Sequence, residues 1–178
     1  MIRLRLLALA VCFLTATAAA QDPAAPVSDA LRSAAQRDGR NLVAAAEEMP
    51  AGKYGYKPTA AQMSFGEVLV HLADGNDALC SSVSGVAAPK RAELAKGASK
   101  EKLVSRLRES FRFCETALAK VDDSDLAAEV PYFGESKVSR AQAIFATVQD
   151  WAGHYSQLAV YLRLNGHLPP TAKGEPAK

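Results

Sequence analysis

The chain has 178 residues, of which 49% are hydrophobic and 22% are charged, and its formal net charge is +2. These proportions are typical of a globular domain and exclude a disordered chain, a collagen-like repeat and a coiled coil. No basic tract is present, so the sequence offers no electrostatic basis for binding nucleic acid or an anionic membrane. We therefore expect one ordinary domain and no nucleic-acid partner.

The first twenty residues have the pattern of a secretory signal peptide. Two arginines precede the apolar run LLALAVCFL at 6–14, and Ala18 and Ala20 place small residues before a cleavage site. The apolar run is shorter than the roughly 20 residues of a membrane-spanning helix. A lipoprotein cysteine at Cys12 is the alternative, but the residue before it is the bulky Val11. We expect an exported protein, periplasmic or extracellular, with no stable membrane anchor.

Four stretches of the remaining chain repeat apolar residues at helical spacing. Their predicted bounds are about 29–49, 64–83, 99–120 and 139–164. Two of these helices begin with a capping box, formed by Ser64 with Glu67 and by Ser139 with Gln142. Proline, glycine or short polar turns follow each stretch and predict where the helices end.

The segments around these helices predict the organisation of the chain. Residues 21–27 form a flexible lead-in, residues 28–170 the folded domain and residues 171–178 a polar tail. Residues 122–137 predict a long crossover loop before the last helix, and no alternating run of β-branched residues predicts a strand. Four amphipathic helices without strands predict an all-α four-helix bundle.

Apolar residues along the last helix predict which side of it faces the core. The predicted stripe comprises Ala141, Ile144, Phe145, Val148, Trp151, Ala152, Tyr155, Leu158 and Leu162. Polar residues also fall among the apolar positions of two other helices. Asn76 needs a hydrogen-bonding partner if it is buried, and Asp38 is either an exposed flank or a partner for a ligand histidine.

Three side chains could hold a metal ion. Asp150 and His154 are four residues apart and share one face of the last helix. His71 lies in the second helix, next to its apolar stripe, and is expected to point into or beside the interior of the bundle. Two imidazoles and a carboxylate are ligands that divalent metals accept. The alternative is a hydrogen-bonded core histidine beside an ordinary surface ion pair.

Other polar candidates have weaker support. His167 follows the end of the last helix and is expected to be solvated. Asp74, one turn after His71, is either a hydrogen-bonding partner for that histidine or simply exposed. Tyr155, Tyr161 and Trp151 are expected to pack or to line a pocket for a small-molecule ligand.

The two cysteines that remain after residue 20 form a candidate disulfide. Cys80 and Cys114 lie on the second and third predicted helices, at or beside apolar positions. A disulfide fits an oxidising compartment, and two separate buried thiols are the alternative.

Two segments together resemble the DinB-like (DinB/YfiT) superfamily of four-helix bundles. Residues 44–85, AAAEEMPAGKYGYKPTAAQMSFGEVLVHLADGNDALCSSVSG, are similar to the end of its first helix, its tyrosine–proline loop and its histidine-bearing second helix. Residues 150–170, DWAGHYSQLAVYLRLNGHLPP, are similar to its last helix. The resemblance covers most of residues 28–172 and implies a bundle with a metal site.

The resemblance also implies ligands and chemistry. Family members bind a divalent metal such as Zn or Ni through three residues, usually histidines, which correspond to His71, Asp150 and His154. Asp150 departs from the common pattern, which has histidine there. The characterised enzymes of the family include metal-dependent thiol transferases and isomerases, in which the metal presents a thiolate.

These observations predict an exported metal-binding bundle that acts as a hydrolase or a thiol transferase on an unidentified substrate. The alternatives are a non-catalytic binding or stress-related module with a vestigial metal site, and an interaction bundle, such as a homodimer, without a small-molecule site.

Overall fold

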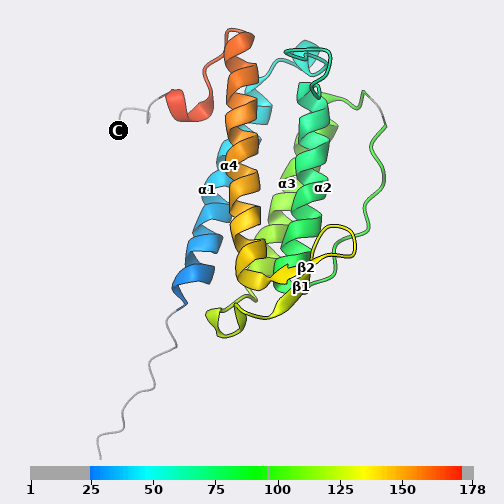
Figure 1. Cartoon of the computed structure of the whole chain (residues 1–178). Helices are drawn as coiled ribbons and strands as arrows, with labels where there is room; N and C mark the ends of the chain where they lie inside the picture. Colours follow the sequence, from blue (N-terminus) through cyan, green and yellow to red (C-terminus); the bar gives the residue numbers. More distant parts are fainter. Residues whose placement is uncertain (1–24, 96, 174–178) are drawn as a thin grey trace, which may run out of the picture.

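The computed structural model of the protein describes residues 25–95 and 97–173, and these form a bundle of four helices (Figure 1). The long helices are α1 (Pro26–Glu48), α2 (Phe65–Ser84), α3 (Lys100–Leu118) and α4 (Arg140–Leu164). The predicted all-α four-helix fold is confirmed, and each helix begins and ends within three residues of its predicted bounds. The predicted signal peptide lies outside the described residues.

Five short elements complete the described chain. Three single-turn helices are η1 (Ala51–Lys53), η2 (Asp123–Asp125) and η3 (Pro170–Ala172), and two strands are β1 (Glu129–Pro131) and β2 (Lys137–Ser139). The prediction that 122–137 is only a loop is wrong, because the two strands pair antiparallel with Val130 opposite Val138. Each strand has three residues, which is too short to show the alternation that identifies a strand in sequence.

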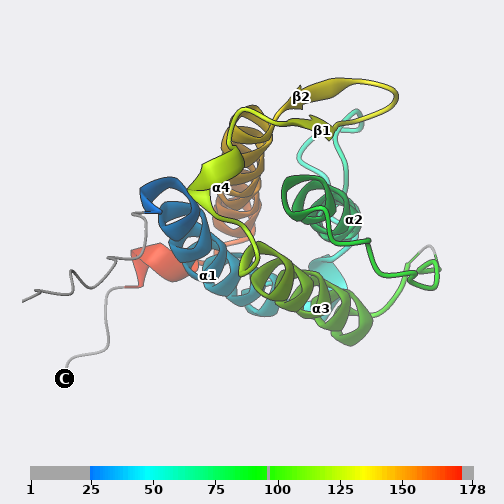
Figure 2. The same ribbon diagram turned by 90° about the horizontal axis from the view of Figure 1, so that it is seen from below.

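The helices occupy the corners of a square (Figure 2). Both α1 and α2 pack against α3 and against α4, so each of them has two neighbours. This arrangement places α2 beside α4, the two helices that carry the candidate metal ligands. Within the described part of the chain, no helix combines the length and the hydropathy that crossing a membrane would require.

A buried amide joins three of the four helices. The Asn76 side chain of α2 accepts a hydrogen bond from Nε1 of Trp151 on α4 at 2.7 Å. It also donates a hydrogen bond to Oγ of Ser110 on α3 at 2.9 Å. All three residues are fully buried. The expectation that Asn76 requires a partner is thus confirmed, and its two partners fix α2 against both neighbours.

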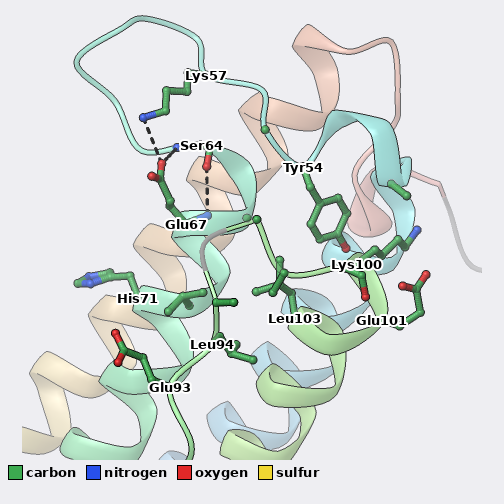
Figure 3. Close-up of a pocket in the computed structure, with 18 residues that line it drawn as sticks. Tyr54, Lys57, Ser64, Glu67, His71, Glu93, Leu94, Lys100, Glu101 and Leu103 are labelled. Atoms are coloured by element: carbon green, nitrogen blue, oxygen red, sulfur yellow. Dashed lines mark hydrogen bonds and ion pairs between the residues drawn. The ribbon is translucent and has the colours of Figure 1, made fainter.

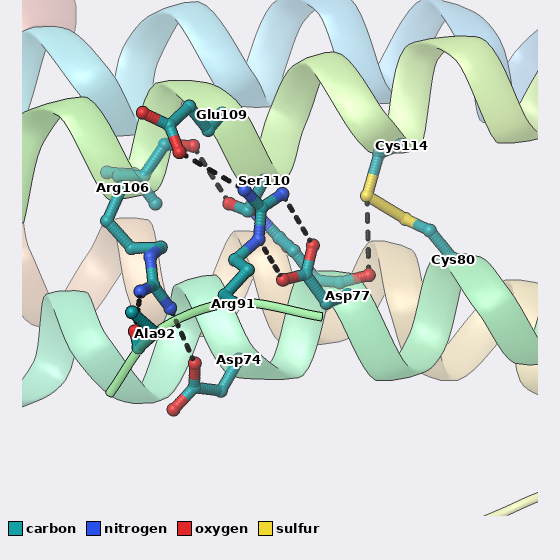
Figure 4. A network of polar contacts seen from close by, with 11 residues as sticks. Asp74, Asp77, Cys80, Arg91, Ala92, Arg106, Glu109, Ser110 and Cys114 are labelled. Atoms are coloured by element: carbon teal, nitrogen blue, oxygen red, sulfur yellow. Dashed lines mark hydrogen bonds and ion pairs between the residues drawn. A yellow bond between two sulfur atoms is a disulfide. The ribbon is translucent and has the colours of Figure 1, made fainter. Parts of the chain in front are cut away.

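A disulfide and a group of ion pairs hold α2 against α3 (Figure 4). Cys80 and Cys114 are bonded to each other, as predicted, with their Cα atoms 5.2 Å apart. Nearby, the guanidinium of Arg91, which follows α2, lies between the carboxylates of Asp77 and Glu109, the latter at 3.2 Å. The segment after α2 is therefore tied to both helices.

The outward side of α4 departs from the predicted apolar stripe. Trp151 and Leu158 are buried as expected, but Phe145 is 76% exposed and Ala152 is also exposed. Successive residues turn about 100° around a helix axis, so Phe145 and Ala152 fall outside the arc that faces the bundle. The prediction that these two residues belong to the core is wrong.

The Asn76 network generates a test of stability. Asn76→Ala leaves the buried indole N–H of Trp151 without its acceptor, so we expect the free energy of unfolding to fall by about 2–4 kcal/mol. Ser110→Ala is the matched variant, because it removes one partner only and should cost about 1 kcal/mol. Urea unfolding followed by circular dichroism measures both. Equal stability of Asn76→Ala and wild type would contradict this account of the network.

The disulfide generates a second test. Titration of free thiols in the denatured, unreduced chain from Gln21 onwards should detect none, and reduction should release two. Because the bridge closes a loop across a sequence separation of 34, reduction should lower stability by roughly 3–4 kcal/mol. Two titratable thiols before reduction would refute the bridge.

Candidate metal site between α2 and α4

Two histidines face each other across the contact between α2 and α4. The ring centres of His71 and His154 are 5.2 Å apart, and the ring planes cross at 69°. His154 is half-buried, whereas His71 is exposed, so His71 lies beside the interior of the bundle and not within it. The two histidines that the sequence singled out are thus brought together at the surface.

Asp150 completes the group from the same helix as His154. Its Oδ1 lies 3.4 Å from Nε2 of His154, as expected for residues four apart on a helix. On the other side of the ring, Nδ1 of His154 lies 3.1 Å from Oε1 of Gln157. Both ring nitrogens therefore face oxygen acceptors, which orients the imidazole. Gln157 was not among the candidates from sequence, because its role depends on the ring position of His154.

These contacts change the proton affinity of His154. Its pKa is raised above the ordinary value of 6.5, first by the hydrogen bond to Asp150 and further by the charge of that carboxylate, while burial opposes the shift. The contact with Gln157 also raises the pKa of His154. In the absence of a metal, the proton on the ring is therefore held more firmly than in a free histidine.

The carboxylate of Asp150 lies over Gly75 on α2. A Cβ atom built on Gly75 would meet Oδ2 of Asp150 at 3.9 Å and no other atom within 4 Å. Gly75 is one turn after His71 on α2. The second carboxylate oxygen thus faces α2, over a position with no side chain, while the first faces His154.

The three side chains are of types that bind divalent metals, and the spacing of the two imidazole rings also suits a shared metal ion. Two imidazoles bound to one tetrahedral ion have their ring centres about 5 Å apart, because each metal–nitrogen bond is about 2 Å. In the present conformation, however, Nε2 of His154 faces Asp150. Among the described residues, no three His, Cys, Asp or Glu side chains form a group that would hold a metal as they stand.

The other polar candidates lie in different contacts. His167 pairs with Glu48 of α1, with 3.6 Å between Nδ1 and Oε1. Asp74 pairs with Arg106 at 3.7 Å and does not serve His71. Neither reading of Asp38 is correct: it is buried, and both of its oxygens accept hydrogen bonds from the adjacent Arg37.

The three predicted pocket aromatics have other environments. Trp151 and Tyr161 are buried in the core, where the indole binds Asn76 and the phenol donates to the carbonyl oxygen of Met63. Tyr155 is half-buried, and its hydroxyl is hydrogen-bonded to Thr171. These side chains therefore stabilise the bundle and its C-terminal segment, because their polar groups are already engaged within the protein.

A cavity of about 890 Å³ lies on the other side of His71 (Figure 3). Its walls come from the first half of α2, the start of α3 and the loop residues around 51–57, 93–95 and 97–99. Apolar side chains such as Val70, Leu94 and Leu103 line it together with the charged Lys57 and Glu93. The sequence analysis did not predict this cavity, because the cavity forms only where two loops that are distant in sequence meet at α2.

A capping box shapes one rim of the cavity. Oε2 of Glu67 accepts a hydrogen bond from the backbone N–H of Ser64 at 2.6 Å and pairs with Lys57 at 3.2 Å. The contacts with Ser64 and then Lys57 lower the pKa of Glu67 to about 2. The loop before α2 is therefore fixed to the helix whose next turn carries His71.

Comparisons with known proteins agree with this architecture. The model of the DinB superfamily matches residues 34–158, so the chain belongs to that superfamily. The crystal structure of YjoA, a DinB-like protein from Bacillus subtilis, is similar to this fold, with a TM-score of 0.64 and 19% sequence identity. The match covers 78% of this chain and 93% of that one. The search of curated proteins returned no match.

The pair of Asp150 and His154 generates a test by titration. In Asp150→Asn the carboxylate is lost, so the pKa of His154 should fall. Proton NMR of the histidine rings against pH measures it. Asp74→Asn is the matched control, because it removes one negative charge from the neighbouring surface and should leave the pKa of His154 unchanged. An unchanged pKa in Asp150→Asn would contradict the assigned contact.

The same pair predicts how stability depends on pH. Since folding raises the pKa of His154, the pair stabilises the fold below pH 6.5, and that contribution is lost as pH rises through the raised pKa. At each pH, the effect of Asp150→Asn is the difference between its free energy of unfolding and that of Asp74→Asn. This loss of stability should be larger at pH 5 than at pH 9. Urea unfolding at both pH values tests this, and the reverse order would contradict it.

Proposed function

We propose that this DinB-superfamily bundle binds a divalent metal ion, such as Zn or Ni, through His71, Asp150 and His154. The observation that carries the proposal is the meeting of the two imidazoles, with ring centres 5.2 Å apart, beside the carboxylate of Asp150. The placement of the carboxylate supports it, since Oδ2 of Asp150 lies over Gly75 of α2, the helix that carries His71.

The residues have separate roles in this proposal. Asp150 and His154 would ligate from α4 and His71 from α2. Gln157 would accept the Nδ1 proton of His154, which leaves Nε2 with its lone pair free to ligate. Before binding, that nitrogen must lose the proton that Asp150 stabilises. As the pH is lowered, metal affinity is therefore expected to start falling at a higher pH than it would at a site with an isolated histidine.

The cavity beside His71 would hold the substrate. Its volume of about 890 Å³ is within the range of small-molecule sites. Its apolar walls suit the body of an organic molecule, and Lys57 and Glu93 provide charges of both signs at the rim. A bound divalent cation would supply Lewis-acid chemistry, activating water or a thiol. This combination favours a hydrolase or a thiol transferase.

We propose further that the protein is exported to the periplasm or beyond. The disulfide between Cys80 and Cys114 is of a kind that persists in oxidising compartments. The signal-peptide pattern of residues 1–20 is consistent with this location.

A non-catalytic binding or stress-related module is the second candidate. One observation favours it: His154 is already satisfied by Asp150 and Gln157 without a metal. The three side chains could then persist as an ordinary polar cluster.

Metal analysis of the purified protein separates these candidates. Wild type should carry about one Zn or Ni ion per chain, and both His71→Ala and His154→Ala should lose it. His167→Ala is the matched control, because this histidine pairs with Glu48 away from the site, and it should keep the metal. Wild type that binds no metal after loading with Zn or Ni would contradict the proposal.

A further inference from the structure

The outward face of α4 differs in chemistry from those of the other helices. Most of its exposed residues run along one stripe: Phe145, Gln149, Ala152, Ser156, Val160 and Leu164. The other exposed residues of this helix are Gln142, Gly153 and Arg163, and Arg163, near the C-terminal end, is the only charged residue among all nine. We refer to the six residues from Phe145 to Leu164 listed first as the outer stripe. Between Arg140 and Arg163, the only Asp, Glu, Lys or Arg in α4 is Asp150, which faces α2.

The exposed faces of the other helices carry charges. Examples are Arg40 on α1, Asp74 on α2 and Arg112 on α3. A helix on the surface of a soluble protein normally presents charged side chains opposite the core. Charge depletion combined with exposed large apolar side chains is typical of a protein–protein interface. In the outer stripe, Phe145, Leu164 and Val160 are 76%, 56% and 51% exposed.

Four residues of the stripe are placed symmetrically about the peptide bond between Ala152 and Gly153. Phe145 lies seven residues before Ala152, and Val160 lies seven residues after Gly153. Gln149 and Ser156 lie three residues on either side in the same way. The large apolar side chains are therefore towards the ends, and the small residues are at the centre.

We propose that this protein forms a homodimer in which the outer stripes of two α4 helices pack antiparallel around a two-fold axis. In a two-fold interface the same patch is used twice, and each contact occurs twice. With the axis beside Ala152 and Gly153, Phe145 of one copy meets the partner's Val160, and Gln149 meets the partner's Ser156. The small central residues allow the helix axes to approach closely.

The available area fits a reversible dimer. Phe145, Val160 and Leu164 each expose on the order of 100 Å², and their smaller or polar neighbours on the stripe add a comparable sum. Two copies would thus bury about 1,200 Å², at the lower end of specific interfaces. The interface leaves Asp150 and His154 free, because they face α2, so the dimer does not depend on the proposed metal site.

Sedimentation equilibrium of the purified protein tests the proposal. Wild type should change from monomer to dimer as its concentration rises through the micromolar range. Ala152→Glu places two like charges beside the axis and should keep the protein monomeric with an unchanged circular dichroism spectrum. Thr116→Glu, at an exposed position on α3, is the matched control and should still dimerise. Wild type that stays monomeric at 1 mM would overturn the proposal.

Cysteine cross-linking tests the register. Under mild oxidation, a mixture of Phe145→Cys and Val160→Cys chains should form disulfide-linked dimers. Neither variant alone should do so, since copies of the same residue lie about 22 Å apart along the antiparallel pair. Efficient linkage of Phe145→Cys to itself would indicate a parallel or unrelated contact and would overturn the proposed geometry.

Discussion

The hydrogen bond between the indole of Trp151 and the amide of Asn76 sets the register of α4 on α2. Both residues are fully buried, so breaking the bond would leave polar groups without water or protein partners. Their sequence neighbours occupy the candidate site. Asp150 precedes Trp151 and faces Gly75, which precedes Asn76. One turn later on α4 and one turn earlier on α2, His154 meets His71. A core interaction thus determines which surface residues come together.

The pattern of apolar residues predicts the bundle well, because helical spacing and capping boxes are local signals. Ser64 and Ser139 cap their helices as expected. The short β1–β2 hairpin was missed because three-residue strands have no visible period. Phe145 and Ala152 were assigned to the core because the last helix is apolar on more than one side. Periodicity alone does not identify which apolar side packs against the other helices.

The candidate site could be predicted from sequence only in part. The spacing of Asp150 and His154 fixes their contact, since both lie on one helix. The meeting of His154 with His71 depends on how two helices pack, and here the family resemblance supplied what spacing could not. The cavity beside His71 and the role of Gln157 were not predictable, because they depend on loop conformation and on the orientation of a ring.

The four sides of α4 have distinct roles in this account. One packs into the core through Trp151 and Leu158, and another contacts α1. A third presents Asp150 and His154 to α2. The outward side carries the outer stripe, which we assign to a second copy of the chain. Because the metal site and the stripe lie on different sides, metal binding and dimerisation should be separable by mutation.

The most direct test of the central claim is anomalous X-ray diffraction from crystals of the protein loaded with zinc. The account predicts one anomalous peak between α2 and α4, about 2 Å from a ring nitrogen of His71, a ring nitrogen of His154 and an oxygen of Asp150. Zinc found only elsewhere, for example at His167 and Glu48, would contradict it.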